Sequence, residues 1–275
     1  MASTCDRYLS TFTASIAILV LLGPASAQEG GGESDVERGE YLSHAAGCTA
    51  CHTDPDEGER FAGGRMLPTP FGVVSVPNIT PHEETGIGSW DAANFKRALH
   101  EGIRKDGAPI YPAMPYTNFT MIRDEDVEAL WAYFQSVEPV ENEVDDNTLP
   151  FPFNVRTGIS GWQAVYFEPG RFEPDPDESE EFNRGAYLAE ALTHCSACHT
   201  PRNSVGAKLG NAQHLKGAPL KPWYAPNISG DENSVLDSYT IESLTAFLSE
   251  GHDGEGRTPY GRMAETVYES TAMLN

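Results

Sequence analysis

Two short stretches of the sequence hold the residue types that could do chemistry, C-T-A-C-H at positions 48–52 and C-S-A-C-H at positions 195–199. Each has the C-x-x-C-H spacing that is typical of c-type haem attachment. Two thiols near one turn of helix can form thioethers with the two vinyl groups of one porphyrin, and the adjacent histidine can ligate the iron. The spacing therefore predicts two covalent haem groups, attached through Cys48, Cys51, Cys195 and Cys198, with His52 and His199 as iron ligands.

Two other kinds of site share the C-x-x-C pattern. A zinc knuckle would need further Cys or His residues at finger spacing, and a thioredoxin-like dithiol would need a βαβ context without an obligatory histidine. A wider repeat surrounds both motifs, and this favours the haem interpretation over the other two.

A methionine follows each motif at a similar distance. Met114 lies in Y-P-A-M-P-Y, whose prolines hold the chain extended and leave the thioether free to point at an iron. Met263 occupies the matching place in Y-G-R-M. A sulfur opposite an imidazole fills both axial positions and raises the reduction potential. We therefore predict Met114 and Met263 as the second axial ligands, with Met66 and Met121 as rivals that have no counterpart in the repeat.

The repeat is visible in several short matches. R-G-E-Y-L at 38–42 recurs as R-G-A-Y-L at 184–188, and P-N-I-T at 77–80 recurs as P-N-I-S at 226–229. The separations along the chain are 146, 147 and then 149 residues, which suggests two extra residues in the loop after the second motif. The other histidines do not recur as an aligned set, and only His100 and His252 are worth checking as substitute ligands.

Length and composition set the broad class. The 275 residues suggest two domains, and 39% hydrophobic residues are normal for a folded globular protein. Four of the five cysteines lie in the two motifs, and Cys5 falls in a segment that we expect to be removed. The sequence therefore leaves no pair of cysteines for a structural disulfide.

The formal net charge of −23 argues against nucleic acid as a partner, because phosphate binding needs a basic face. Two interpretations of this charge stay open. It can be a solvated acidic surface, or it can be a docking face for a basic redox partner, whose steering salt would weaken.

The N-terminus predicts export. Residues 1–27 combine Arg7, a short apolar run and the small-residue cleavage motif A-S-A at 25–27, which is typical of a signal peptide; an uncleaved anchor is the alternative. Residues 28–34 are rich in Gly and Glu and read as a flexible mature N-terminus. No later segment is long and apolar enough to span a membrane. We expect a periplasmic protein, because c-type haem is attached on that side of the inner membrane.

The elements around the motifs predict an all-α fold with two tandem class I cytochrome c domains. The first domain is expected over 35–137, with helices over 35–46, 89–101 and from 124 onward, N-capped by Asp35, Ser89 and Asp124. Gly102 is placed to end the second of these helices. A loop rich in Gly and Pro, 54–88, suits a chain that wraps around a flat cofactor.

Residues 138–182 are expected to form a connector whose ends are acidic linker and whose aromatic middle is a packed strap; a quinone or partner site there is the less favoured alternative. The second domain is expected over 183–275. By the repeat, Asn275 falls beside Asp124, so this domain would lack its last helix and leave apolar surface bare. A truncated fragment of a longer protein is the favoured interpretation, and a naturally short domain is the alternative.

These motifs, with F-A-G-G at 61–64, T-G-I-G at 85–88 and H-C-S-A-C-H-T-P-R-N at 194–203, resemble the cytochrome c subunit of bacterial membrane-bound alcohol dehydrogenases. The similar subunit of gluconate and sorbitol dehydrogenases shares them. The resemblance implies a periplasmic subunit that takes electrons from a quinoprotein or flavoprotein dehydrogenase and passes them to ubiquinone. It also implies three haem domains and a C-terminal membrane-associating part in that family, whereas this sequence has two motifs.

Two classes of function are compatible with two haem motifs. An electron-transfer subunit would have two closed, six-coordinate irons, whereas a dihaem enzyme such as a peroxidase would have one open iron. A candidate methionine in each copy favours the electron-transfer subunit. No catalytic dyad, phosphate loop or activated nucleophile is recognisable, so the oxidation chemistry would belong to a partner with its own cofactor.

Overall fold

The computed structural model describes residues 34–145 and 147–274, which belong to one compact unit. The predicted signal peptide and all but the last residue of the predicted flexible N-terminus lie outside the described residues. Within the described part of the chain, no helix has the length and apolarity to cross a membrane. We call residues 35–137 the first half and residues 183–274 the second half.

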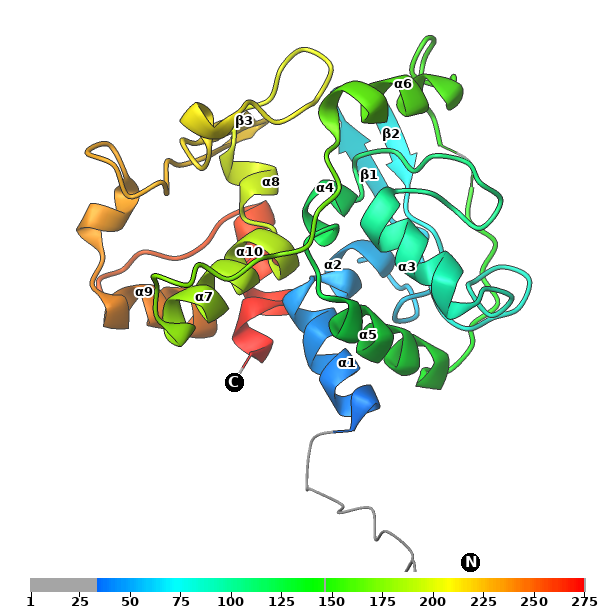
Figure 1. The fold of residues 1–275 in the computed structure, drawn as a ribbon, viewed down its shortest axis with the longest axis horizontal. Helices are drawn as coiled ribbons and strands as arrows, with labels where there is room; N and C mark the ends of the chain where they lie inside the picture. The colour runs from blue at the N-terminus through cyan, green and yellow to red at the C-terminus, as the bar shows by residue number, and fades with distance from the viewer. Residues whose placement is uncertain (1–33, 146, 275) are drawn as a thin grey trace, which may run out of the picture. The chain divides into compact units, whose positions relative to one another are not determined.

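Five helices form the first half, and three of them lie where the sequence predicts helices (Figure 1). They are α1 (Asp35–Ala45), α2 (Cys48–His52), α3 (Ala92–Glu101), α4 (Tyr116–Phe119) and α5 (Asp124–Ser136). Gly102 does end α3, with φ of 64°, in the left-handed region that favours glycine. This order places the first C-x-x-C-H motif on α2, directly after α1.

All three predicted N-caps were wrong. Ser34 caps α1 in a capping box with Glu37, a signal that S-x-x-E at 34–37 carries in the sequence. Asp91, not Ser89, caps α3 through a bond from the Asn94 amide. Asp124 is instead the first residue of α5, where acidic side chains favour the positive end of the helix dipole.

Two short antiparallel hairpins qualify the all-α expectation. They are β1 (Met66–Thr69) with β2 (Gly72–Ser75), and β3 (Ala218–Leu220) with β4 (Trp223–Ala225). Each hairpin lies between a C-x-x-C-H motif and the P-N-I segment that follows it. The loops that the sequence suggested would wrap a cofactor therefore contain extended structure.

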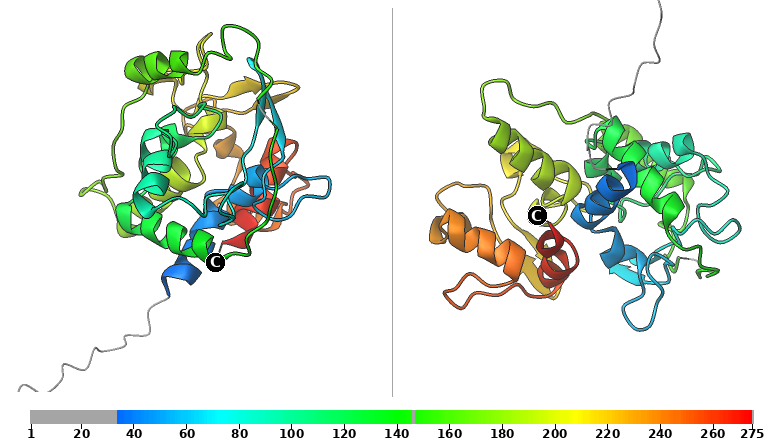
Figure 2. Two further views of the ribbon diagram at one scale, coloured as in Figure 1. Left: turned by 90° about the vertical axis from the view of Figure 1, so that its right-hand side faces the viewer. Right: turned by 90° about the horizontal axis from the view of Figure 1, so that it is seen from below.

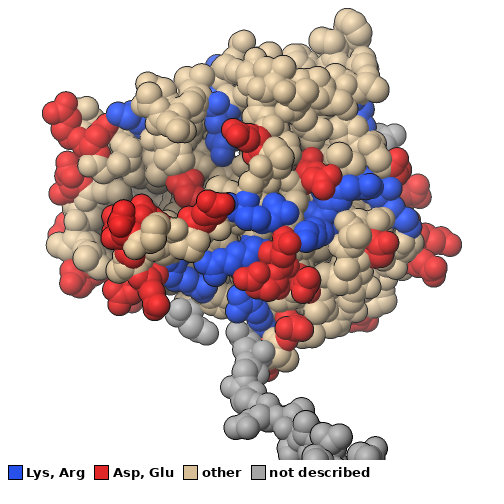
Figure 3. Space-filling view, in the orientation of Figure 1, with Lys and Arg blue, Asp and Glu red and all other residues tan. Residues whose placement is uncertain are grey.

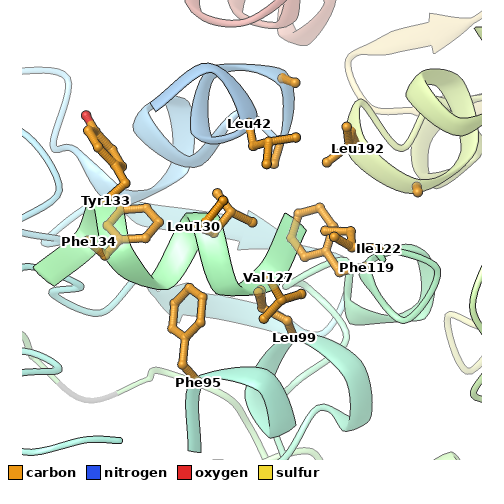
Figure 4. Close-up of a cluster of buried hydrophobic side chains, with 14 of the residues drawn as sticks. Leu42, Phe95, Leu99, Phe119, Ile122, Val127, Leu130, Tyr133, Phe134 and Leu192 are labelled. Atoms are coloured by element: carbon orange, nitrogen blue, oxygen red, sulfur yellow. The ribbon is translucent and has the colours of Figure 1, made fainter. Parts of the chain in front are cut away.

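The core of the first half lies between α1 and α5 and is rich in aromatic residues (Figure 4). Phe61 meets Phe134 edge to face, with ring centroids 5.1 Å apart, and Phe95 packs on the other side of Phe134. Leu42 of α1 is buried here, whereas Val36, which the sequence also placed on the inward face, is exposed. Burial of these side chains supplies the main driving force for folding of this half.

The connector at 138–182 contains α6 (Thr157–Tyr166), a helix that the sequence analysis did not predict. None of its residues is buried, and none is charged. The aromatic residues of the connector differ in their surroundings. Phe151 is 80% exposed, whereas Phe167 and Phe172 pack edge-on or tilted against Tyr116 and Tyr187.

The second half also has a helix before its motif, a hairpin after it and a ten-residue helix that follows the hairpin (Figure 2). Its helices are α7 (Glu180–Tyr187), the π-helical turn η1 (Leu188–Leu192), α8 (Ser196–His199), α9 (Ile241–Glu250) and α10 (Arg262–Glu269), with 3₁₀ turns η2 (Asn211–Gln213), η3 (Val235–Ser238) and η4 (Thr271–Met273). The second C-x-x-C-H motif thus lies at the start of α8.

The expectation that the second half would expose its apolar surface is correct for one part and wrong for another. Tyr187, Ala191 and Leu192 are fully buried because they join the core of the first half, where Leu192 lies near Ile122 (Figure 4). In contrast, α9 has no buried residue, and Ile241 is 83% exposed. The first half therefore covers the apolar side chains at the end of α7 and in η1, whereas it leaves α9 uncovered.

Charged side chains of both signs are interspersed on the face shown in Figure 3, while the upper part of this face carries few charges. Asp124 accepts hydrogen bonds from Lys96 Nζ at 2.7 Å and Arg171 Nε at 2.9 Å. These two bonds lower the pKa of the Asp124 carboxyl to about 2. The charge of Asp124 is therefore compensated by two local ion pairs.

Candidate haem-binding sites

The first motif forms the single helical turn α2, and all its thiols are free. Burial raises the pKa of the Cys48 thiol to about 12, and burial also raises the pKa of Cys51. A redox dithiol needs a lowered thiol pKa, so these surroundings do not fit that alternative. Among the described residues, no group of three or more His, Cys, Asp or Glu side chains could hold a metal ion.

His52 is oriented by a backbone carbonyl. Its Nδ1 lies 2.8 Å from Pro77 O. A carbonyl oxygen only accepts, so Nδ1 carries the proton and Nε2 keeps its lone pair. Burial lowers the pKa of His52, which holds the ring in the neutral form that a metal needs. The ring is therefore prepared as an iron ligand through Nε2.

His199 has the same surroundings in the second half. Its Nδ1 lies 2.7 Å from Pro226 O, and burial lowers its pKa as well. The P-N-I repeat explains this agreement. Asn78 Oδ1 accepts from the amide and the hydroxyl of Thr80, and Asn227 Oδ1 accepts in the same way from Ser229. Each asparagine fixes a turn that presents the preceding proline carbonyl to the imidazole.

A glycine amide donates a hydrogen bond to the backbone carbonyl of each histidine. The amide of Gly63 donates to His52 O at 2.8 Å, and the amide of Gly217 donates to His199 O at 2.7 Å. Both glycines have positive φ, and a Cβ on Gly63 would lie 2.4 Å from the Pro77 carbonyl carbon.

These two glycines are 154 residues apart, which the sequence analysis missed. The net gain of two residues after the second motif therefore combines a larger insertion before Gly217 with a deletion between Gly217 and the P-N-I segment. Gly63 carries a signal in F-A-G-G, whereas Gly217 has no matching neighbours in sequence.

Both predicted methionines follow a turn in which the methionine amide donates to a tyrosine carbonyl, Met114 to Tyr111 and Met263 to Tyr260, each at 3.1 Å. Met114 lies just before α4 and packs against the core. Met263 differs from the expected extended loop, because it lies in the first turn of α10. Ala264 stands at the repeat position of Pro115, and its amide donates to Gly261 O at 3.1 Å, a bond that a proline cannot make.

The rival methionines lie in other surroundings. Met66 is on β1 and is 45% exposed, and Met121 packs on the core next to the connector, where its carbonyl accepts from the Phe172 amide. Of the substitute histidines, His100 is fully buried with Nε2 bonded to Ile122 O, and His252 is exposed beside Glu250.

A cavity of about 1100 Å³ is lined by two of the eight predicted site residues, one from each half, whereas the other six are not among its lining residues: Cys48, Cys195, His52, His199, Met114 and Met263. Cys51 and Cys198 both line it, as do the residues on either side of Met114 and Arg262 beside Met263. Aromatic and apolar side chains such as Phe71, Leu220 and Trp162 form much of the remaining wall. Free thiols, neutral imidazoles with Nε2 available and an apolar wall fit a haem group.

Two arginines also support the motifs and were missed. Arg65 donates to Ala50 O in the first motif, and Arg202 Nη2 donates to Ala197 O in the second motif at 2.8 Å. Both alanines occupy the same position of C-x-x-C-H. The arginines come from different places relative to their motifs, so the repeat could not reveal them.

Comparison with known proteins agrees with this geometry. The family model described as cytochrome c matches residues 36–138. The chain is 39% identical to the fructose dehydrogenase cytochrome subunit of Gluconobacter japonicus, over 91% of this chain and 51% of the relative. It is 36% identical to the alcohol dehydrogenase (quinone) cytochrome c subunit of Gluconobacter oxydans, over 98% of this chain and 59% of the relative.

A third relative is matched over more of its own length. The chain is 33% identical to a dihaem cytochrome c-type protein of Cereibacter sphaeroides, over 87% of this chain and 81% of the relative. The chain thus spans between half and three-fifths of the two dehydrogenase subunits, but most of the dihaem protein. It belongs to the cytochrome c family that includes the cytochrome subunits of alcohol, fructose and gluconate dehydrogenases.

Proposed function

We propose that this chain is a periplasmic electron-transfer subunit with two haem c groups, one in each of two tandem domains over 35–137 and 183–275. Cys48 and Cys51 attach the first haem, and Cys195 and Cys198 attach the second. The iron ligands are His52 with Met114, and His199 with Met263.

The observation that carries this proposal is that His52 and His199 have the same kinds of hydrogen-bond partners. In each half a proline carbonyl holds Nδ1 within 2.8 Å and a glycine amide holds the histidine carbonyl within 2.8 Å. Two chain segments that differ by insertions and deletions therefore give each histidine the same two kinds of partner, a proline carbonyl and a glycine amide. Such agreement supports two working sites rather than one site and a remnant.

In electron transfer, the protein itself holds the iron ligands in place and limits the access of water to the haem groups. A haem c group bound there supplies a one-electron iron couple. Each proline carbonyl fixes the tautomer and the direction of its imidazole, so that the ligand does not have to reorient when the charge of the site changes. The methionine sulfur is a soft neutral ligand that favours the reduced state. The apolar part of the cavity wall reduces contact with water and so lowers the cost of reorganisation.

We propose that electrons come from a partner dehydrogenase, a quinoprotein or flavoprotein large subunit, and leave to ubiquinone or another respiratory acceptor. The names of the relatives support a dehydrogenase partner. The predicted signal peptide supports export and a place at the outer face of the inner membrane. In this proposal the chain itself catalyses no substrate oxidation.

Mass spectrometry of protein exported by a strain that matures c-type cytochromes tests the haem count. We expect the mature chain plus two haem groups, and a low-spin spectrum with an iron–sulfur band that Met114→Ala weakens for one haem only. Met66→Ala is the matched control, because Met66 is exposed on β1, and we expect it to leave the band intact. Fewer than two haems would contradict the proposal, and tight cyanide binding at one haem of the unmodified protein would favour a dihaem peroxidase.

A further inference from the structure

The segments that follow the two predicted methionines are packed crosswise. α4, which begins two residues after Met114, contacts η1, the turn that leads into the second motif. α10, which contains Met263, contacts α2, the helix of the first motif. Each half therefore places its methionine segment against the attachment motif of the other half.

One of these crosswise contacts is a buried polar network around Asn118 of α4. Asn118 is fully buried. Its Nδ2 donates to Ser196 Oγ at 2.8 Å and to Glu190 O at 2.7 Å. Lys208 Nζ donates to Asn118 Oδ1 at 2.9 Å and to Ser196 Oγ at 3.2 Å. Because Ser196 lies between Cys195 and Cys198, the network joins the Met114 segment directly to the second attachment motif.

The crosswise contact in the other direction is built differently. Arg65 joins Ala50 O of the first motif to Glu265 of α10, with Nη2 and Oε2 2.9 Å apart. The Glu265 side chain is 39% exposed, so solvent weakens this ion pair.

The second half has no counterpart of Asn118 at the matching position of the repeat. Val267, 149 residues after Asn118, is fully buried and has no side-chain hydrogen bond to offer. Thr49 stands in the first motif where Ser196 stands in the second, and its hydroxyl is buried without a partner among the described residues. A fully buried polar side chain that bonds the opposite motif is therefore found in one direction, at Asn118, whereas the contact in the other direction is the partly exposed ion pair of Arg65.

We propose that Asn118 is a positioning residue for the second haem site, the site of the opposite half. This inference rests on the proposed function. A buried hydrogen bond is directional, and an unpaired buried donor is costly, so the network holds the α8 turn in one place relative to α4. The backbone that carries Cys195, Cys198 and His199 is thereby fixed by a residue only four positions from the iron ligand of the first site.

Redox titration of Asn118→Ala tests this inference. The Asn118→Ala protein and its reference, which keeps Asn118, both carry Met114→His. This substitution changes the iron ligand of the first haem and so separates the absorption signal of the first haem from that of the second. At a fixed ambient potential, we expect the ratio of reduced to oxidised second haem to change about twofold or more on Asn118→Ala, because outer partners tune a metal site. The one remaining iron–sulfur band, which belongs to the second haem, is expected to weaken.

Asn183→Ala is the matched control, since Asn183 is an asparagine whose three side-chain donor bonds go to residues 175–179 at the end of the connector. We expect it to leave both readouts unchanged. Ser196→Ala removes the same bond from the other side and serves if Asn118→Ala does not fold. Ser196→Thr keeps a hydroxyl, as Thr49 does in the first motif, and is expected to leave the second-haem titration of the Met114→His protein unchanged.

An unchanged second haem in Asn118→Ala or Ser196→Ala, with two haems present by mass, overturns the inference. A change confined to the first haem also overturns it. Fewer than two haems in the unmodified protein is a different result, because it contradicts the proposed function itself.

Discussion

The two halves of the molecule contain the same helix in different surroundings. In α3, Phe95, Leu99 and His100 are buried, and α5 packs on this helix. In α9 no residue is buried, and among the described elements its main packing partners are the short elements α10 and η4. Both helices end at a glycine with positive φ, Gly102 and Gly251. The repeat therefore reproduces local structure, whereas burial depends on a helix from elsewhere in the chain.

The comparison also shows that the second half depends on the first. Tyr187 and Leu192 are fully buried in the core of the first half. Tyr187 Oη donates to Asp126 at 2.5 Å and accepts from the Arg123 amide at 3.1 Å. The first half has a core of its own, and the second half uses part of it. We expect substitutions in the shared core to weaken both halves together.

The largest expected difference concerns a matched pair of leucines, Leu99 in α3 and Leu248 in α9, which lie 149 residues apart. Leu99 is 8% exposed, so Leu99→Ala is expected to lower the free energy of unfolding by about 2–5 kcal/mol. Leu248 is only partly buried, and Leu248→Ala is expected to cost about 1 kcal/mol or less. Chemical denaturation measures both values. Equal losses would contradict the comparison.

The second prediction concerns acid stability, and it again separates α3 from α9. Burial, followed by the positive charge of Arg171, lowers the pKa of His100 to about 4, while Asp124 and the Ile122 carbonyl oppose the shift. Between pH 6.5 and 4 the unfolded chain takes up a proton that the folded chain does not, so stability falls as the pH falls. The loss from this one group amounts to up to about 3 kcal/mol.

His100→Gln removes this titration and is expected to flatten the decline of stability between pH 6.5 and 4. Gln retains a donor for Ile122 O. The control is His252→Gln near the end of α9, where the histidine is exposed and the decline is expected to keep its slope. Thermal unfolding across this pH range gives the comparison. An identical slope in His100→Gln and the unmodified protein would rule out this origin of acid sensitivity.

The smallest expected difference concerns two tyrosines from the R-G-x-Y-L repeat. Tyr187→Phe removes the hydroxyl bonded to Asp126, whose side chain is buried, and is expected to cost about 1–3 kcal/mol. Tyr41→Phe removes a hydroxyl that meets only Arg184 at 3.4 Å, and its expected cost is below about 0.5 kcal/mol. Urea unfolding separates them. A larger effect at Tyr41 would show that the halves do not share their core as described.

Sequence patterns predicted the main helices well, because the relevant signals are local. Apolar spacing located α1, α3 and α5, and Gly102 was placed correctly at the end of α3. The N-caps were missed although S-x-x-E at 34–37 carries a local signal. The hairpins were missed because their strands are only three or four residues long and one strand of each hairpin contains a proline. Met263 was expected in a loop because Met114, its counterpart in the repeat, lies in a loop.

The sequence by itself determined the two C-x-x-C-H motifs, the helices that lead into them and the P-N-I turns, since each depends on neighbours within a few residues. Only the tertiary structure decided that proline carbonyls 25 and 27 residues away orient His52 and His199. It also decided that Asn118 bonds Ser196 while Thr49 has no such partner. The reason is physical: a local pattern fixes backbone angles, whereas burial and long-range hydrogen bonds depend on which distant segments pack together.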